Sequence, residues 1–245
     1  MDKREFYYDS ADGKTRIHAV EWIPKNAPCC VLQIVHGMAE YVDRYDRLAV
    51  SLAEKGILVT GNDHLGHGKS VAEGMPYGFF CSENAPDRVV EDVHSLRRRI
   101  QEEYPNIPYL LMGHSMGSFI LRNYLCVYAQ GLSGAIIMGT GMQPQKLLRF
   151  SQGLVRVLTL LQGEKHKSGL VNALAFGSYN RRISHPVSSM DWLSRDAAEV
   201  AKYNKDPLCG FTFTLGGFAT LFGLIDRLHE KARLKGMPKE LPILF

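Results

Sequence analysis

A serine lies at the centre of the sequence Gly113-His114-Ser115-Met116-Gly117, and the segments on either side of it constrain the fold. Residues 107–112 are mostly apolar and predict a short buried strand, and residues 118–129 predict a helix. A serine on a sharp strand-to-helix turn has strained backbone dihedrals, and flanking glycines relieve the crowding. The helix also directs its first N–H groups toward the serine hydroxyl. The pattern predicts a nucleophile elbow, with Ser115 as the nucleophile.

Strands and helices alternate through the first 140 residues, which predicts a mostly parallel sheet with helices on both faces. An initial antiparallel pair with a turn at Asp12-Gly13 precedes this alternation. The predicted strands are 5–9, 15–23, 30–35, 57–60, 107–112 and 132–138, and the predicted helices are 44–54, 86–104 and 118–129.

The alternation stops after Gly141, and strand character returns only at residues 242–245. We therefore expect a core at 1–140, a helical cap inserted at 141–225, and a return to the core at 226–245. Within the cap, helices are predicted at 146–161, from Ser194 through Tyr203 and at 212–228, with a polar loop at 163–190.

The loop after the strand at 30–35 begins His36-Gly37-Met38. On a fold with a nucleophile elbow, an oxyanion hole combines the N–H after the nucleophile with an N–H from such a loop. This predicts Met38 and Met116 as the two backbone donors. His36, Gly37, Gly113 and Gly117 would then support the loop and the elbow, and His114 is expected to pack rather than act as the base.

The other histidines offer no convincing base or metal site. The candidates His18, His94, His166, His185 and His229 are each expected at the surface rather than beside Ser115. His64 and His67 lie in the glycine-rich loop 63–70 with no third ligand nearby, and the neighbouring thiols of Cys29 and Cys30 cannot both face one ion. We therefore expect neither a metal nor a cofactor.

Charge and composition are those of an ordinary globular protein. The net charge is +4, and the short clusters at 97–99 and 181–182 are expected to be solvated helix faces rather than nucleic-acid contacts. Five scattered cysteines predict reduced thiols and a cytoplasmic protein. The helix at 146–161 fits two interpretations equally, a core-packed helix or a lid that meets acyl chains or makes a peripheral membrane contact.

Together these motifs resemble the α/β-hydrolase superfamily, and within it the monoacylglycerol lipase and lysophospholipase-like group of serine aminopeptidase S33 type. The matching residues are His36-Gly37 with Glu40, Arg44 and Tyr45, the loop 63–70, the elbow 113–117 and the segment 206–210. The family often has histidine where Tyr41 stands. The resemblance implies a triad aspartate and histidine beyond residue 245, following a strand like Leu241–Phe245. It therefore implies a C-terminally truncated chain that is nearly inactive alone.

The function expected from the motifs and the resemblance is hydrolysis of a carboxylic ester, through an acyl-enzyme on Ser115. The resemblance suggests a small acyl ester or lipid, such as a monoacylglycerol or a lysophospholipid, as substrate. An aminopeptidase, a thioesterase or a haloperoxidase on the same fold remains an alternative, because fold does not decide chemistry. A non-catalytic ligand-binding protein is the alternative of a different class. The oligomeric state is left open by the sequence.

Overall fold

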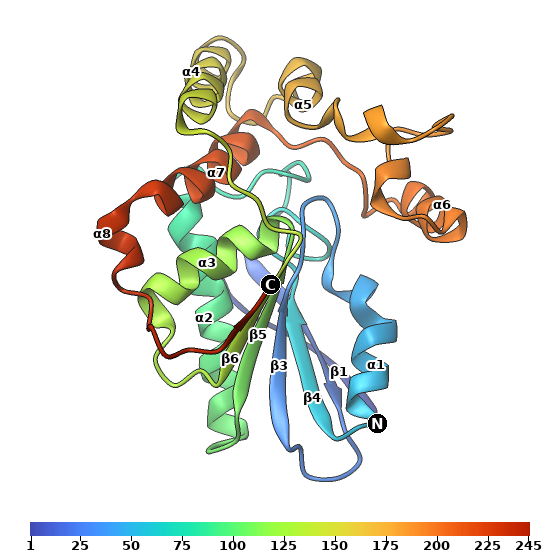
Figure 1. Ribbon diagram of the computed structural model, residues 1–245, viewed down its shortest axis with the longest axis vertical. Coiled ribbons are helices and arrows are strands. Elements are labelled where there is room, and N and C mark those ends of the chain that lie inside the picture. The colour runs from blue at the N-terminus through green and yellow to red at the C-terminus, as the bar shows by residue number, and fades with distance from the viewer.

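A computed structural model describes residues 1–245, and its centre is a seven-stranded sheet (Figure 1). The strand order is β1-β2-β4-β3-β5-β6-β7; β1 and β2 run antiparallel to their neighbours and the others are parallel. The prediction of a mostly parallel sheet is confirmed. The strands are β1 (Asp2–Asp9), β2 (Arg16–Ile23), β3 (Cys30–Val35), β4 (Ile57–Asn62), β5 (Tyr109–His114), β6 (Gly134–Met138) and β7 (Ile243–Leu244).

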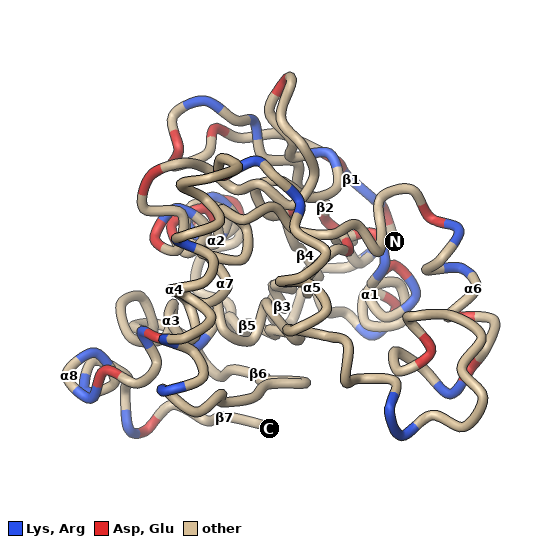
Figure 2. Tube along the Cα trace, turned by 90° about the horizontal axis from the view of Figure 1, so that it is seen from above, with Lys and Arg blue, Asp and Glu red and all other residues tan.

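Helices cover both faces of this sheet. α2 (Ala85–Glu103) and α3 (Met116–Tyr128) pack on one face, where most of the buried apolar side chains gather into a single core. α1 (Asp46–Ala53) packs on the other face over a smaller cluster centred on Trp22. The sequence places a helix at 44–54, but its first turn is a 3₁₀ turn (Val42–Tyr45). Seen from above, the charged residues surround a centre formed by the uncharged strands β3 and β5 (Figure 2).

Arg97 corrects the expectation that the 97–99 cluster is a solvated face. Its side chain lies between α2 and α3, and the residue is only 3% exposed. The guanidinium donates to the carbonyls of Tyr128 (2.7 Å) and Gln130 (2.8 Å) and to the Tyr124 hydroxyl. It thus satisfies the Tyr128 carbonyl, which the end of α3 leaves without a helical partner, and the Gln130 carbonyl in the turn that follows. This arginine fastens the C-terminal end of α3 to α2.

The helices after β6 lie beyond the end of the sheet where α3 begins (Figure 1). The predicted helix at 146–161 is α4, whereas the predicted loop at 163–190 is wrong because it contains α5 and a 3₁₀ turn. The division into core and cap at 140 and 225 stays a prediction. The helices here are α4 (Gln145–Gln162), α5 (Gly169–Phe176), α6 (Ala197–Lys205), α7 (Leu215–Asp226) and α8 (Lys231–Leu234), with 3₁₀ turns at Tyr179–Arg182, Asp191–Leu193 and Arg227–His229.

The last strand, β7, pairs in parallel with β6 at the edge of the sheet, with Ile243 opposite Ala135. This agrees with the strand predicted from residues 242–245. All five cysteines are free. No helix combines the length and the apolar composition that crossing a bilayer requires.

Candidate active site

Ser115 occupies the junction between β5 and α3 in a strained conformation. Its φ is 53° and its ψ is −118°, a region that L-residues rarely adopt. Hydrogen bonds hold the turn on both sides. The Ser115 N–H donates to the Met138 carbonyl (2.9 Å), and the Ser115 carbonyl accepts from the N–H (2.9 Å) and hydroxyl (2.5 Å) of Ser118. Strain of this kind persists only where the surroundings over-determine it, and it is common at functional sites.

The elbow requires glycine at positions 113 and 117 because neighbouring backbone atoms leave no room there for a side chain. A Cβ on Gly117 would overlap the carbonyl oxygen of Val35, at the end of the adjacent strand β3. A Cβ on Gly113 would lie 2.5 Å from the Gly117 carbonyl oxygen. The first turn of α3 therefore packs directly against the end of β3. This contact fixes the distance between the elbow and the loop that follows β3.

That loop lies against Ser115. A Cβ added to Gly37 would be 3.3 Å from the Cβ of Ser115, so residue 37 faces the serine side chain. Met38 follows in the same loop, and Met116 begins α3 directly after Ser115. The assignment of their N–H groups as oxyanion donors stays a prediction that this arrangement accommodates.

His36 is buried behind the loop rather than facing Ser115. Its Nε2 accepts the N–H of His64 (3.0 Å), and its Nδ1–H donates to the Gly37 carbonyl (2.8 Å). Its ring lies 4.0 Å from the ring of His64 and 5.3 Å from the ring of His67. Burial lowers the pKa of His64 to about 3 and that of His67 to about 4, and that of His36 also falls well below its usual value. All three rings are neutral at pH 7.

His114 joins a buried polar cluster that the sequence does not reveal. The Tyr45 hydroxyl donates to Oε1 of Glu40 (2.8 Å), so Nδ1 of His114, 2.9 Å from the same hydroxyl, carries a proton and donates to it. Gly37 N–H donates to the same Glu40 oxygen (2.6 Å). Burial alone would raise the pKa of Glu40, but the hydrogen bond and charge of His114, the charge of Arg44 and the Tyr45 hydroxyl together lower it. The carboxylate thus stays ionised and ties the loop to the elbow.

The remaining histidines do not reach Ser115, because they are engaged elsewhere or exposed. His18 corrects the surface expectation, because its side chain is fully buried between Asp63 (2.9 Å) and Glu5 (2.9 Å). His94 stacks on Tyr128, and Nε2 of His229 lies 3.1 Å from the Gln143 carbonyl oxygen. His166 and His185 are exposed. Within residues 1–245, no imidazole is hydrogen-bonded to the Ser115 hydroxyl.

The glycine-rich loop 63–70 is organised by the Asp63 carboxylate. Asp63 accepts the N–H groups of Val42 (2.9 Å) and Lys69 (2.9 Å) and contacts the His18 imidazole. A Cβ on Gly68, whose φ is +48°, would overlap this carboxylate. No group of three or more His, Cys, Asp or Glu side chains has an arrangement suited to holding an ion.

Comparison with known proteins places this architecture among characterised hydrolases. Residues 26–245 match the family model described as serine aminopeptidase, S33. The chain is 32% identical over 232 residues to the monoglyceride lipase of Mus musculus, covering 91% of this chain and 66% of that protein. It is 30% identical over 204 residues to a monoglyceride lipase homolog of Monkeypox virus, covering 83% of this chain and 65% of the relative. The chain thus spans slightly less than two thirds of the length of these relatives.

Solved structures agree with the sequence comparison. A highly thermostable carboxyl esterase from Bacillus coagulans, solved in complex with glycerol, superposes with a TM-score of 0.89 at 28% sequence identity. The alignment covers 99% of this chain and 78% of the esterase. The match extends over the sheet, the elbow and the helices α4 to α7 alike.

Proposed function

The chain belongs to the serine aminopeptidase S33 family of α/β hydrolases, and from this membership we propose that it hydrolyses carboxylic esters through an acyl-enzyme on Ser115. The observation that carries the proposal is the strained backbone of Ser115 between β5 and α3, with Gly37 packed against its side chain. A conformation of this kind leaves the hydroxyl accessible to a bound carbonyl group.

In the proposed reaction, Ser115 Oγ attacks the ester carbonyl carbon, and the negative charge that develops on the carbonyl oxygen is stabilised by the N–H groups of Met38 and Met116. The alcohol leaves, and water then hydrolyses the acyl-enzyme. No imidazole of residues 1–245 is hydrogen-bonded to the Ser115 hydroxyl to accept its proton. The proposal therefore assigns to this chain the nucleophile and the oxyanion donors, and leaves the base and its carboxylate partner unassigned.

A monoacylglycerol is the substrate that the names of the relatives favour. A lysophospholipid shares its single acyl chain and ester bond and is the closest alternative, and an aminoacyl amide is the alternative within the S33 family. Rates on these three substrates, measured at equal concentration, would rank them. Cleavage of the amide alone would contradict the ester proposal.

Covalent labelling with a fluorophosphonate, followed by intact-mass measurement, tests the role of Ser115. One adduct is expected on the unaltered protein and none on Ser115→Ala, with ester hydrolysis falling to the rate in buffer. Ser151→Ala removes a hydroxyl on α4 that donates only to the Leu147 carbonyl, and it should label normally. The adduct must map to Ser115 in the peptide digest.

A second candidate is a protein that binds an acyl ligand without turning it over. It predicts no adduct on the unaltered protein, together with saturable binding of a monoacylglycerol ether that cannot be hydrolysed. Labelling of the unaltered protein at Ser115 would exclude it.

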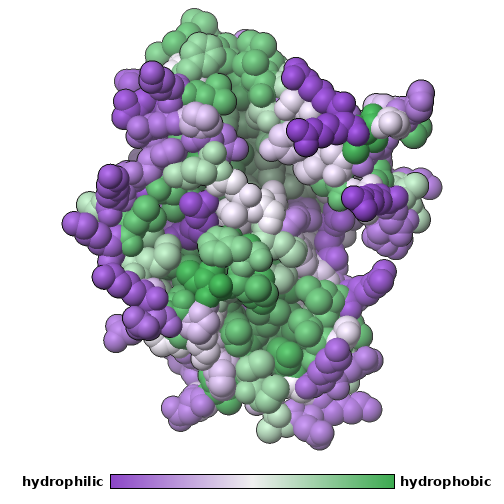
Figure 3. Space-filling view, in the orientation of Figure 1, coloured by the Kyte–Doolittle hydropathy of each residue, from purple (hydrophilic) through white to green (hydrophobic).

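The outer face of α4 and α5 supports a peripheral membrane contact. Phe150 is 66% exposed and Leu160 is 81% exposed, and much of the surface over α4, at the top of the view, is apolar (Figure 3). Residues 145–193 also contain seven Lys or Arg but only two Asp or Glu, which favours an anionic surface. Neighbouring exposed side chains are Leu147, Leu161, Leu170 and Leu174.

Sedimentation with lipid vesicles checks this contact. Replacing Phe150 and Leu160 by serine is expected to weaken binding to vesicles containing 30% phosphatidylserine by roughly tenfold or more, because each buried side chain contributes about 1.5–3 kcal/mol. Val127→Ser, at another exposed apolar site, on α3, should bind as the unaltered protein does. Equal binding by all three proteins would contradict the proposal.

A further inference from the structure

The loop that carries Met38 contains a second strained residue. Ala39 has a φ of +52° although it has a side chain, and it is only 5% exposed. Alanine gains no local hydrogen bond in this conformation, unlike asparagine or aspartate. The strain must therefore be held by contacts from outside the loop.

Those contacts come from the segment 197–210, which we call the cap arm; it comprises α6 and the turn after it. The Ala39 carbonyl accepts two hydrogen bonds from this arm, one from the Tyr203 hydroxyl (2.9 Å) and one from the Gly210 N–H (3.0 Å). Tyr203 is buried, so its hydroxyl has exchanged water for this single partner. Two donors from one distant segment thus fix the orientation of the 39–40 peptide.

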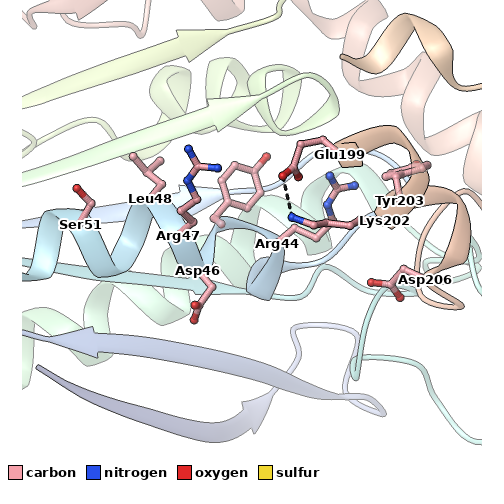
Figure 4. A pocket seen from close by; sticks show the side chains of 10 residues that line it. Arg44, Asp46, Arg47, Leu48, Ser51, Glu199, Lys202, Tyr203 and Asp206 are labelled. Carbon is pink, nitrogen blue, oxygen red and sulfur yellow. Dashed lines mark hydrogen bonds and ion pairs between the residues drawn. The ribbon is translucent and has the colours of Figure 1, made fainter. Parts of the chain in front are cut away.

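Two further interactions join the cap arm to the segment that follows Ala39. The Tyr41 hydroxyl donates to Oδ2 of Asp206 (2.8 Å). The Arg44 guanidinium lies 4.6 Å from the centre of the Tyr203 ring, a cation–π contact that orients the ring. Figure 4 shows Arg44, in the 3₁₀ turn before α1, and Tyr203 and Asp206 on the facing arm; these residues line a cavity of about 670 Å³. The arm and the loop are therefore connected by side chains from both sides.

We propose that Tyr203 is a positioning residue, through which the cap arm holds Ala39 in its left-handed conformation and so keeps the Met38 N–H directed at the oxyanion. Glu40 fixes the loop from the sheet side by accepting the Gly37 N–H, and Tyr203 fixes it from the cap side. Displacement of the arm then disorders the Met38 donor without any movement of Ser115. The effect on catalysis rests on the proposed ester hydrolysis, whereas the effect on the loop does not.

Tyr203→Phe removes only the hydroxyl and keeps the ring under Arg44. We expect amide hydrogens of residues 38–41 to exchange about tenfold faster in this variant. On a short ester such as 4-nitrophenyl acetate, kcat should fall about tenfold while KM changes less than twofold, because the oxyanion forms only in the transition state. The matched control is Tyr179→Phe, since the Tyr179 ring packs on Trp192 and its hydroxyl makes no hydrogen bond to the protein.

A second substitution separates positioning from general damage to the cap. Ala39→Gly makes the left-handed conformation inexpensive, so the combined Ala39→Gly/Tyr203→Phe variant should regain most of the lost kcat. Unchanged exchange at residues 38–41 in Tyr203→Phe would overturn the proposal, as would equal losses of kcat with alanine and with glycine at 39. Another outcome is that neither the unaltered protein nor a variant hydrolyses the ester, while amide exchange at residues 38–41 is still faster in Tyr203→Phe. In that case the positioning role stands and the proposed function fails.

Discussion

Lowering the pH from 6.5 to 5 is expected to reduce the free energy of unfolding by about 3 kcal/mol, at 1.36 kcal/mol per pKa unit for each fully titrating group and less for imidazoles that are already half protonated at pH 6.5 in the unfolded chain. The cause is the buried cluster of His36, His64 and His67, whose pKa values burial lowers, to about 3 for His64 and about 4 for His67. The unfolded chain binds a proton at each ring below pH 6.5, and the folded protein does not. The stability that these three neutral rings contribute is therefore present above pH 6.5 and is lost as the pH falls.

Asp92, also buried, acts in the opposite direction. Burial raises the pKa of Asp92 to about 7 despite hydrogen bonds from Ala11 and Ser10, so the folded protein keeps this proton where the unfolded chain releases it. Between pH 5 and 6.5, the proton that Asp92 keeps offsets the loss of stability caused by about one histidine. The net loss is therefore that of about two histidines. Above pH 6.5 the loss of stability at Asp92 nearly cancels the remaining gain from the three histidines, so the free energy of unfolding is expected to level off above about pH 7.

Urea denaturation at half-unit steps of pH measures this dependence. His67→Gln cannot titrate, and it should reduce the slope of unfolding free energy against pH by about one proton. His185→Asn is the control, because His185 is exposed and its φ of 52° suits asparagine. A free energy of unfolding that stays constant from pH 6.5 to 5 would contradict the conclusion that these three buried imidazole rings are neutral in the folded protein.

Replacing Gly117 by alanine is expected to destabilise the protein by on the order of 3 kcal/mol and to abolish labelling of Ser115. The added methyl group would overlap the Val35 carbonyl, which is backbone in the centre of the sheet and has no room to move. The first turn of α3 must then retreat from β3, and this motion would change the backbone of Ser115. Thermal unfolding and fluorophosphonate labelling measure the two effects.

Gly153 provides a control of opposite sign. It also lies within a helix, α4, but no atom beyond its immediate neighbours lies within 4 Å of where its Cβ would be. Alanine there should stabilise the protein by about 0.5–1 kcal/mol, the usual difference between the two residues in a helix. If both substitutions stabilised the protein, the close approach at Gly117 would be disproved.

The sequence predicts the core better than the cap, for a physical reason. Strands such as 30–35 and the elbow are defined by local apolar runs and glycines, and those features determine the parallel sheet directly. Helix α5 was missed because it has only eight residues between polar segments, and its start depends on a cap from Ser168. Short helices are held by tertiary packing rather than by their own propensity.

Some residues of the candidate site could be predicted from the sequence and others could not. Ser115 and the loop at 36–38 carry sequence patterns of their own. The cluster of Glu40 with His114 joins residues 74 positions apart, and the bond from Tyr203 to Ala39 joins residues 164 apart. No spacing within one segment could have indicated these pairs. The buried places of Arg97 and His18 were missed for the same reason, since charged residues are seldom buried unless partners elsewhere in the chain meet them.

The attachment of Arg97 to the last carbonyls of α3 has a consequence for the opposite end of that helix. A strained turn can relax if the helix after it slides along its own axis. The 13 residues of α3 extend about 20 Å at 1.5 Å per residue, and Arg97 anchors their far end to α2. Ser115 therefore precedes a helix whose far end is fixed in place. The geometry of its turn depends on the buried Arg97 guanidinium, a full helix length away.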